Sequence, residues 1–158
     1  MKRIVNCILL LLFISSSMRA YTPEIKTIKL NDGEEIEARL CLPDSLTKTI
    51  VFCISGTGAT TYLTKRASFN YYDELAKGFC EQGLAFFTYN RRGCMDSDKP
   101  PLYVEVDSAK YAKYTPLQEA EDVESMITAL VDDKRFAESK IVLYGISEGT
   151  IIASVVAE

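Results

Sequence analysis

The sequence has 158 residues, of which 47% are hydrophobic and 25% are charged. This composition is ordinary for one globular domain and disfavours disorder. The formal net charge is −4, and it becomes −7 if the first 20 residues, with three basic and no acidic side chains, are removed. This acidic balance argues against a general nucleic-acid-binding surface.

The first 20 residues have the layout of a secretory signal peptide. Lys2 and Arg3 form a short basic region, the stretch 4–14 is almost entirely apolar, and Ala20 is a plausible last residue before cleavage. The apolar stretch is too short for a stable membrane span, although an uncleaved anchor or a buried N-terminal helix stays open. We expect residues 1–20 to be a signal peptide and the mature protein to be secreted or periplasmic, with no membrane span after cleavage.

Four cysteines lie beyond the expected cleavage position. Their spacing fits neither a zinc-binding pattern nor a C-x-x-C motif, and we expect neither a metal nor a cofactor. Cys53 lies within an apolar run and is expected to be a buried thiol. A disulfide between Cys80 and Cys94 stays open, because these two cysteines bracket one step from helix to strand.

The strand pattern begins with a β-hairpin. Residues 25–30 and 36–42 each alternate between apolar and polar side chains, and the turn sequence Asn31-Asp32-Gly33 lies between them. Three later segments are continuous apolar runs, which are typical of strands buried on both faces of a parallel sheet. These runs are residues 49–54, 84–89 and 141–144.

Helical patterns separate the apolar runs. The segment 69–80 places its apolar residues on one helical face, and Gly83 is a natural stop after it. The next helix begins at Thr115 as N-cap, followed by Pro116 at the first helical position. Gln118 lies three residues after Thr115, and this spacing predicts a capping box.

A third helix begins near Glu148. The order hairpin, β, α, β, α, β, α predicts an α/β fold, with a mostly parallel sheet covered by helices on both faces. The segment 91–114 is too long for a routine connection, so we expect it to be mobile or to form a functional lip. Its tyrosines could line an aromatic pocket, but packing onto the domain is the simpler expectation. The expected buried residues of the third helix are Ile151, Ile152, Val155 and Val156.

The sequence Gly145-Ile146-Ser147-Glu148-Gly149 is a G-x-S-x-G motif. The motif alone is weak, but here it directly follows a predicted buried strand and directly opens a helix, as a nucleophile elbow requires. Side chains at Gly145 and Gly149 would clash with neighbouring backbone in such a sharp turn. Ser147 would be held out at the edge of the sheet, and the N–H of Glu148 would be one donor to a developing oxyanion.

A second oxyanion donor is expected in the loop after the first parallel strand. That loop has the sequence Ser55-Gly56-Thr57-Gly58, and the N–H of Thr57 is the best candidate. An ordinary glycine-rich turn is the alternative. A phosphate-binding loop is disfavoured, because the segment has neither the G-K-[ST] ending of a P-loop nor the G-x-G-x-x-G pattern.

These motifs together resemble the α/β-hydrolase superfamily, in particular exported bacterial members with a Ser-Gly-x-Gly loop. Residues 89–93 are similar to the Y-D-x-R-G turn of that family, with Asn90 in place of the usual Asp. The similarity covers residues 25–158 and implies an incomplete α/β-hydrolase fold, with residues 21–158 as the N-terminal portion of the domain. Arg91 and Arg92 are expected in a solvated loop, with a substrate anion site as the alternative.

The resemblance implies a serine hydrolase with Ser147 as the catalytic nucleophile and an ester, thioester or peptide carbonyl as substrate. In this family the acid and the His of the triad follow the serine in the chain, but the 158 residues contain no His. We therefore expect both partners to lie beyond Glu158, the strand 141–144 to be an exposed edge, and the chain alone to be inactive. The alternatives are a non-catalytic hydrolase-like binding protein and an inactive truncated product.

Overall fold

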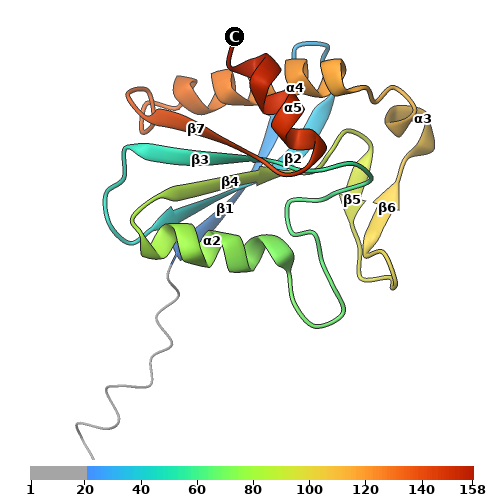
Figure 1. The fold of residues 1–158 in the computed structure, drawn as a ribbon, viewed down its shortest axis with the longest axis horizontal. Helices are drawn as coiled ribbons and strands as arrows, with labels where there is room; N and C mark the ends of the chain where they lie inside the picture. Colours follow the sequence, from blue (N-terminus) through green and yellow to red (C-terminus); the bar gives the residue numbers. More distant parts are fainter. Residues whose placement is uncertain (1–20) are drawn as a thin grey trace, which may run out of the picture.

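The computed structural model describes residues 21–158, and the signal-peptide prediction lies outside them (Figure 1). The strands and helices, in chain order, are β1 (Tyr21–Lys29), β2 (Glu35–Pro43), β3 (Thr49–Ile54), α2 (Tyr71–Glu81), β4 (Ala85–Tyr89), β5 (Cys94–Asp96), β6 (Val104–Val106), α3 (Ser108–Tyr111), α4 (Pro116–Asp132), β7 (Lys140–Gly145) and α5 (Glu148–Val156).

The main sheet has the strand order β1-β2-β4-β3-β7. Strand β2 is antiparallel to both of its neighbours, whereas β4, β3 and β7 are parallel, so four of the five strands run in one direction. The chain passes from β3 to β4 on one side and then to β7 on the other, so the strand progression reverses at β3. In open α/β sheets, ligands bind outside the carboxyl ends of the strands at such a reversal.

Helices cover both faces of this sheet. Helix α2 lies on one face and α4 and α5 lie on the other (Figure 1). The alternation of side chains along a strand explains how one strand serves both layers. In β3, Val51 and Cys53 pack in the cluster that includes α2, whereas Phe52 and Ile54 pack in the cluster that includes α4 and α5.

The three apolar runs become strands, but only two of them are buried on both faces. Every residue of β4 and all but the first residue of β3 are buried or nearly so. The prediction for residues 141–144 is wrong in this respect, because β7 is the last strand of the sheet and Val142 and Tyr144 are each 38% exposed. The expectation of an exposed edge at β7 is confirmed for the described chain.

Two predicted helix faces differ from the structure. Helix α2 begins after Phe69, whose side chain is 47% exposed, while Gly83 follows the helix with a φ of +75° as expected. Of the four residues of α5 that were expected to be buried, only Ile152 is fully buried, whereas Ile151 and Val155 are 64% and 40% exposed. These two side chains are exposed because no other described element covers that side of α5.

Helix α4 begins as predicted, but its capping box is only half formed. The Thr115 hydroxyl accepts a hydrogen bond from the backbone N–H of Gln118 at 3.0 Å. The Gln118 side chain does not return to Thr115. Its amide donates instead to the carboxylates of Glu121 and Asp122, each at 3.2 Å.

The segment 91–114 is a structured projection at one end of the sheet. Strands β5 and β6 pair as a small antiparallel hairpin, and α3 follows with Asp107 as its N-cap (Figure 1). Gly93, at a φ of +73°, lies against the backbone of Tyr111, where a Cβ would come within 2.7 Å of the Tyr111 nitrogen. Within the segment, the rings of Tyr111 and Tyr114 stack with 5.9 Å between centroids.

All four cysteines of the described residues are buried and free, so the proposed pairing of Cys80 with Cys94 is not formed. Burial raises the pKa of Cys41 to about 11 and the pKa values of Cys53 and Cys80 to about 12. These thiols are therefore protonated and poorly nucleophilic at neutral pH. Within the same residues, no helix combines the length and the apolar character that crossing a membrane requires.

Candidate active site

Ser147 occupies the sharp turn between β7 and α5. Its backbone has a φ of +54° and a ψ of −120°, which is a strained conformation for a residue with a side chain. Gly145 and Gly149 flank it, and a Cβ at either position would come closer than 3.0 Å to backbone atoms. The two glycines are therefore required by packing, and the serine side chain is left exposed at the carboxyl end of the sheet.

The loop after β3 lies directly against this turn. A Cβ placed on Gly56 would be 3.1 Å from the Cβ of Ser147 and 3.7 Å from its Oγ. Thr57, the next residue, is exposed. The structure therefore brings together the two segments that the sequence singled out, one with Thr57 and one with Ser147 and Glu148, at the reversal of strand order.

Among residues 21–158, no base lies within hydrogen-bonding reach of the Ser147 hydroxyl, which has no hydrogen-bond partner. The carbonyl oxygen of Ser147 accepts from the backbone N–H and the hydroxyl of Thr150. The whole sequence contains no His. The described residues thus place the exposed hydroxyl of Ser147, on a strained backbone, beside the segments that contain Thr57 and Glu148. They do not include a base that would activate this hydroxyl.

The side chain of Glu148 is tied to the segment 91–114. The hydroxyl of Tyr114 donates to Glu148 Oε2 at 2.6 Å. Burial, together with this carboxylate neighbour, raises the pKa of Tyr114. The phenol therefore stays protonated at neutral pH and fixes the end of the segment next to the elbow.

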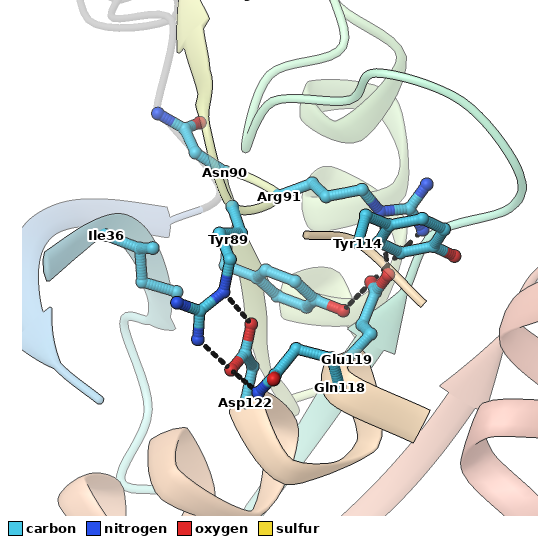
Figure 2. A pocket seen from close by; sticks show the side chains of 9 residues that line it. Ile36, Tyr89, Asn90, Arg91, Tyr114, Gln118, Glu119 and Asp122 are labelled. Atoms are coloured by element: carbon cyan, nitrogen blue, oxygen red, sulfur yellow. Dashed lines mark hydrogen bonds and ion pairs between the residues drawn. The ribbon is translucent and has the colours of Figure 1, made fainter. Parts of the chain in front are cut away.

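Arg91 is the centre of a buried polar cluster beneath Tyr114 (Figure 2). Its guanidinium is 1% exposed, forms an ion pair with Glu119 at 2.7 Å, and lies 4.4 Å from the centre of the Tyr114 ring. The same carboxylate accepts from the hydroxyl of Tyr89 at 2.6 Å. The prediction of a solvated Arg91 is wrong, and the paired guanidinium is not free to bind a substrate anion.

Arg92 is buried as well, so the expected solvated loop is wrong for both arginines. Its Nη2 lies 2.6 Å from Asp122 and its Nη1 lies 2.7 Å from Asp32. The hydrogen bond to Asp122 raises the pKa of Arg92, and it outweighs burial, which acts in the opposite direction. Asn90, at the position of the family's usual Asp, accepts from the backbone N–H of Tyr62 at 2.8 Å instead of forming an ion pair.

The sequence of α4 also indicates these two ion pairs. Glu119 and Asp122 are three residues apart on α4, and both lie on the face that also carries its buried apolar residues. Carboxylates are rarely buried without a partner, so two of them on an inward face indicate two buried cations. The adjacent pair Arg91 and Arg92 meets this requirement.

Residues 21–158 contain no group of three or more His, Cys, Asp or Glu side chains placed to hold a metal ion. No protein-family model matches the sequence, and no curated protein matches it significantly. Solved structures do match its fold, over most of the described chain.

The complex of DcsB with its substrate analogue covers 86% of this chain with a TM-score of 0.60 and 24% identity. The α/β hydrolase GrgF from Penicillium covers 86% with a TM-score of 0.62 and 20% identity, and a dienelactone hydrolase from Anabaena variabilis covers 87% with a TM-score of 0.64 and 14% identity. This chain spans 41% of the length of each of the first two and 57% of the third. Residues 21–158 therefore have the α/β-hydrolase fold in an incomplete form.

Proposed function

We propose that this chain carries the nucleophile of a serine hydrolase that acts on an ester, thioester or peptide carbonyl. The observation that carries the proposal is the strained, exposed Ser147 with Gly56 packed against it. In the proposed reaction, Ser147 Oγ attacks the carbonyl carbon and the N–H groups of Thr57 and Glu148 bind the developing oxyanion. Each such donor contributes about 3 kcal/mol to transition-state stabilisation.

The base that accepts the serine proton must come from outside residues 1–158. The chain has no His, and the hydroxyl of Tyr114 is engaged as a donor to Glu148. Loss of a triad His lowers kcat by about six orders of magnitude. We therefore propose that an acid and a His lie beyond Glu158, and that residues 1–158 alone are essentially inactive.

The similar structures support a small-molecule or peptide acyl substrate in a general way. Their names include the esterase Est22 and an acylaminoacyl peptidase from Pyrococcus horikoshii, and DcsB was solved with a substrate analogue. We also propose that the protein is exported after cleavage behind Ala20. Mass spectrometry of the exported product would test this, since its N-terminal residue should be Tyr21.

The first experiment uses the chain as given. Hydrolysis of p-nitrophenyl acetate by the purified chain should equal that by the Ser147→Ala variant, because neither has a base. A rate that Ser147→Ala abolishes would show that the chain is active alone and that some other group activates the serine.

The second experiment determines the sequence of the transcript beyond codon 158. If the frame continues and encodes an acid and a His, the extended protein should react covalently with a fluorophosphonate at Ser147 and hydrolyse activated esters. Ser147→Ala should abolish both signals. An extended protein without Ser147-dependent hydrolysis would contradict the proposal and favour a hydrolase-like binding protein.

A further inference from the structure

We propose that Arg91 is a positioning residue that holds the loop 55–60 in the conformation required beside Ser147. The inference rests on the proposed function for the role of Thr57 as an oxyanion donor. The effect of Arg91 on the conformation of the loop follows from the contacts of Arg91 alone.

Arg91 contacts the loop through both its side chain and its backbone. One guanidinium nitrogen, Nη1, donates to the carbonyl oxygen of Gly58, and Nη2 donates to that of Ser55 at 3.4 Å. The backbone N–H of Arg91 donates to the carbonyl of Thr60 at 3.0 Å. Because Thr57 lies between two of these carbonyls, Arg91 restrains the backbone on both sides of the proposed donor.

The guanidinium is itself held rigidly. Glu119 on α4 contacts it with both carboxylate oxygens, at 2.7 Å to Nε and 3.1 Å to Nη2. The ring of Tyr114 covers its face (Figure 2). The hydroxyl of that ring donates to Glu148. One buried cation therefore contacts the loop 55–60 directly and is connected to Glu148 through Tyr114.

Only arginine can make this set of contacts. A guanidinium presents donors in a fixed planar fork, which here reaches one carboxylate and two carbonyls at once. A lysine ammonium is a single point on a flexible stem, so Arg91→Lys keeps the charge near Glu119 but loses donors to the loop.

The neighbouring Arg92 provides a matched control. It is also buried, and it also pairs with a carboxylate of α4, that of Asp122. Its side-chain partners are Asp122 and Asp32, neither of which belongs to the loop. Arg92→Lys therefore perturbs a comparable buried ion pair without touching residues 55–60.

The loop can be observed through two glycines. Gly56 is the only glycine that follows a serine, and Gly58 is the only one that follows a threonine. Labelling with ¹⁵N-glycine and carbonyl-¹³C serine and threonine thus assigns both amide signals in the full chain by NMR. We expect Arg91→Lys to shift or broaden both signals and Arg92→Lys to leave them in place, although both variants lower the melting temperature.

Equal behaviour of the two glycine signals in the two variants would overturn the inference. If Arg91→Lys does not fold, Glu119→Gln serves instead, because it removes the charge that fixes the guanidinium, and it should move the same two signals. Unmoved signals in Glu119→Gln would also overturn the inference.

Kinetics separate this inference from the proposed function. In an extended protein with Ser147-dependent hydrolysis, Arg91→Lys should lower kcat about 100-fold with little change in KM, since loss of one oxyanion donor has that size of effect. Hydrolysis that needs Ser147 but is equal in Arg91→Lys and Arg92→Lys would refute the positioning role alone. Shifted glycine signals without any Ser147-dependent hydrolysis would refute the proposed function alone.

Discussion

The α-carbon of Gly149 packs against the carbonyl oxygen of Ile54, so a Cβ at position 149 would come closer than 3.0 Å to that oxygen. This contact joins the first turn of α5 to the end of β3 and thereby sets the elbow beside the loop that follows β3.

Gly149→Ala should therefore destabilise the fold. Overpacking of this kind costs about 1–3 kcal/mol, and a backbone neighbour leaves little room for relaxation. The matched control is Gly78→Ala in α2, where a Cβ would meet no atom within 4 Å and should stabilise the helix by about 0.5–1 kcal/mol. Urea unfolding of both variants checks this, and a neutral Gly149→Ala would contradict the close packing at the elbow.

A second prediction concerns the strain at Ser147. With a φ of +54°, the serine backbone is in a region where a strained residue costs about 1–3 kcal/mol and glycine costs little. Ser147→Gly should thus be more stable than Ser147→Ala by about 1 kcal/mol, after allowance for the greater flexibility of glycine in the unfolded chain. Both variants lack the hydroxyl, so the difference in their melting temperatures reports the backbone. Equal melting temperatures would mean that the turn is unstrained.

A third prediction concerns the buried pair of Arg92 and Asp122. The two side chains are 4% and 7% exposed, and removal of one partner of a buried pair costs about 3–5 kcal/mol when the remaining charge is left unpaired. Because Asp32 would still pair with Arg92, Asp122→Asn should lower the free energy of unfolding by at most that amount. Glu124→Gln, at an exposed position of the same helix, is the control and should change it by less than about 0.5 kcal/mol. Similar losses in the two variants would contradict the importance of the pair.

The sequence predicted the structure correctly where neighbouring residues alone determine the local conformation. The parallel strands followed from apolar runs, Gly83 marked the end of α2, and the motif around Ser147 fell between a strand and a helix as required. It was uninformative where burial depends on elements distant in sequence. We expected Arg91 and Arg92 in a solvated loop because their carboxylate partners on α4 are about 30 residues distant in the sequence.

The exposure of Ile151 and Val155 has the same kind of cause. Helical periodicity identifies an apolar stripe, but it does not say which element covers it. In the described chain nothing covers these two residues, so half of the predicted buried positions of α5 face solvent.

Acid should weaken the ion pair between Asp73 on α2 and Arg39 on β2 of the N-terminal hairpin. Burial alone would raise the pKa of Asp73, but hydrogen bonds from Asn70 and the charge of Arg39 outweigh it, so the pKa lies below its ordinary value of 3.8. The folded state then binds fewer protons than the unfolded state, and the stabilisation is present above pH 3.8 and lost as the pH falls below it.

Asp73→Asn should accordingly reduce stability at neutral pH and make the loss of stability in acid shallower. Urea unfolding at neutral pH and below pH 3.8 measures both effects. The control is Asp44→Asn, at an exposed residue after β2, which should leave the acid-induced loss unchanged. An unchanged loss in Asp73→Asn would assign the acid sensitivity to other carboxylates.

The free edge of β7 should make the chain self-associate. An unpaired strand edge with exposed apolar side chains is a template for pairing with another chain, and Val142 and Tyr144 provide such side chains on β7. A lysine on an edge strand opposes this pairing, so Val142→Lys should reduce the concentration dependence of the sedimentation coefficient. Leu46→Lys adds the same charge at a residue that is 96% exposed outside the sheet, and it should leave association unchanged. If both lysines reduce association equally, net charge and not the edge of β7 governs it.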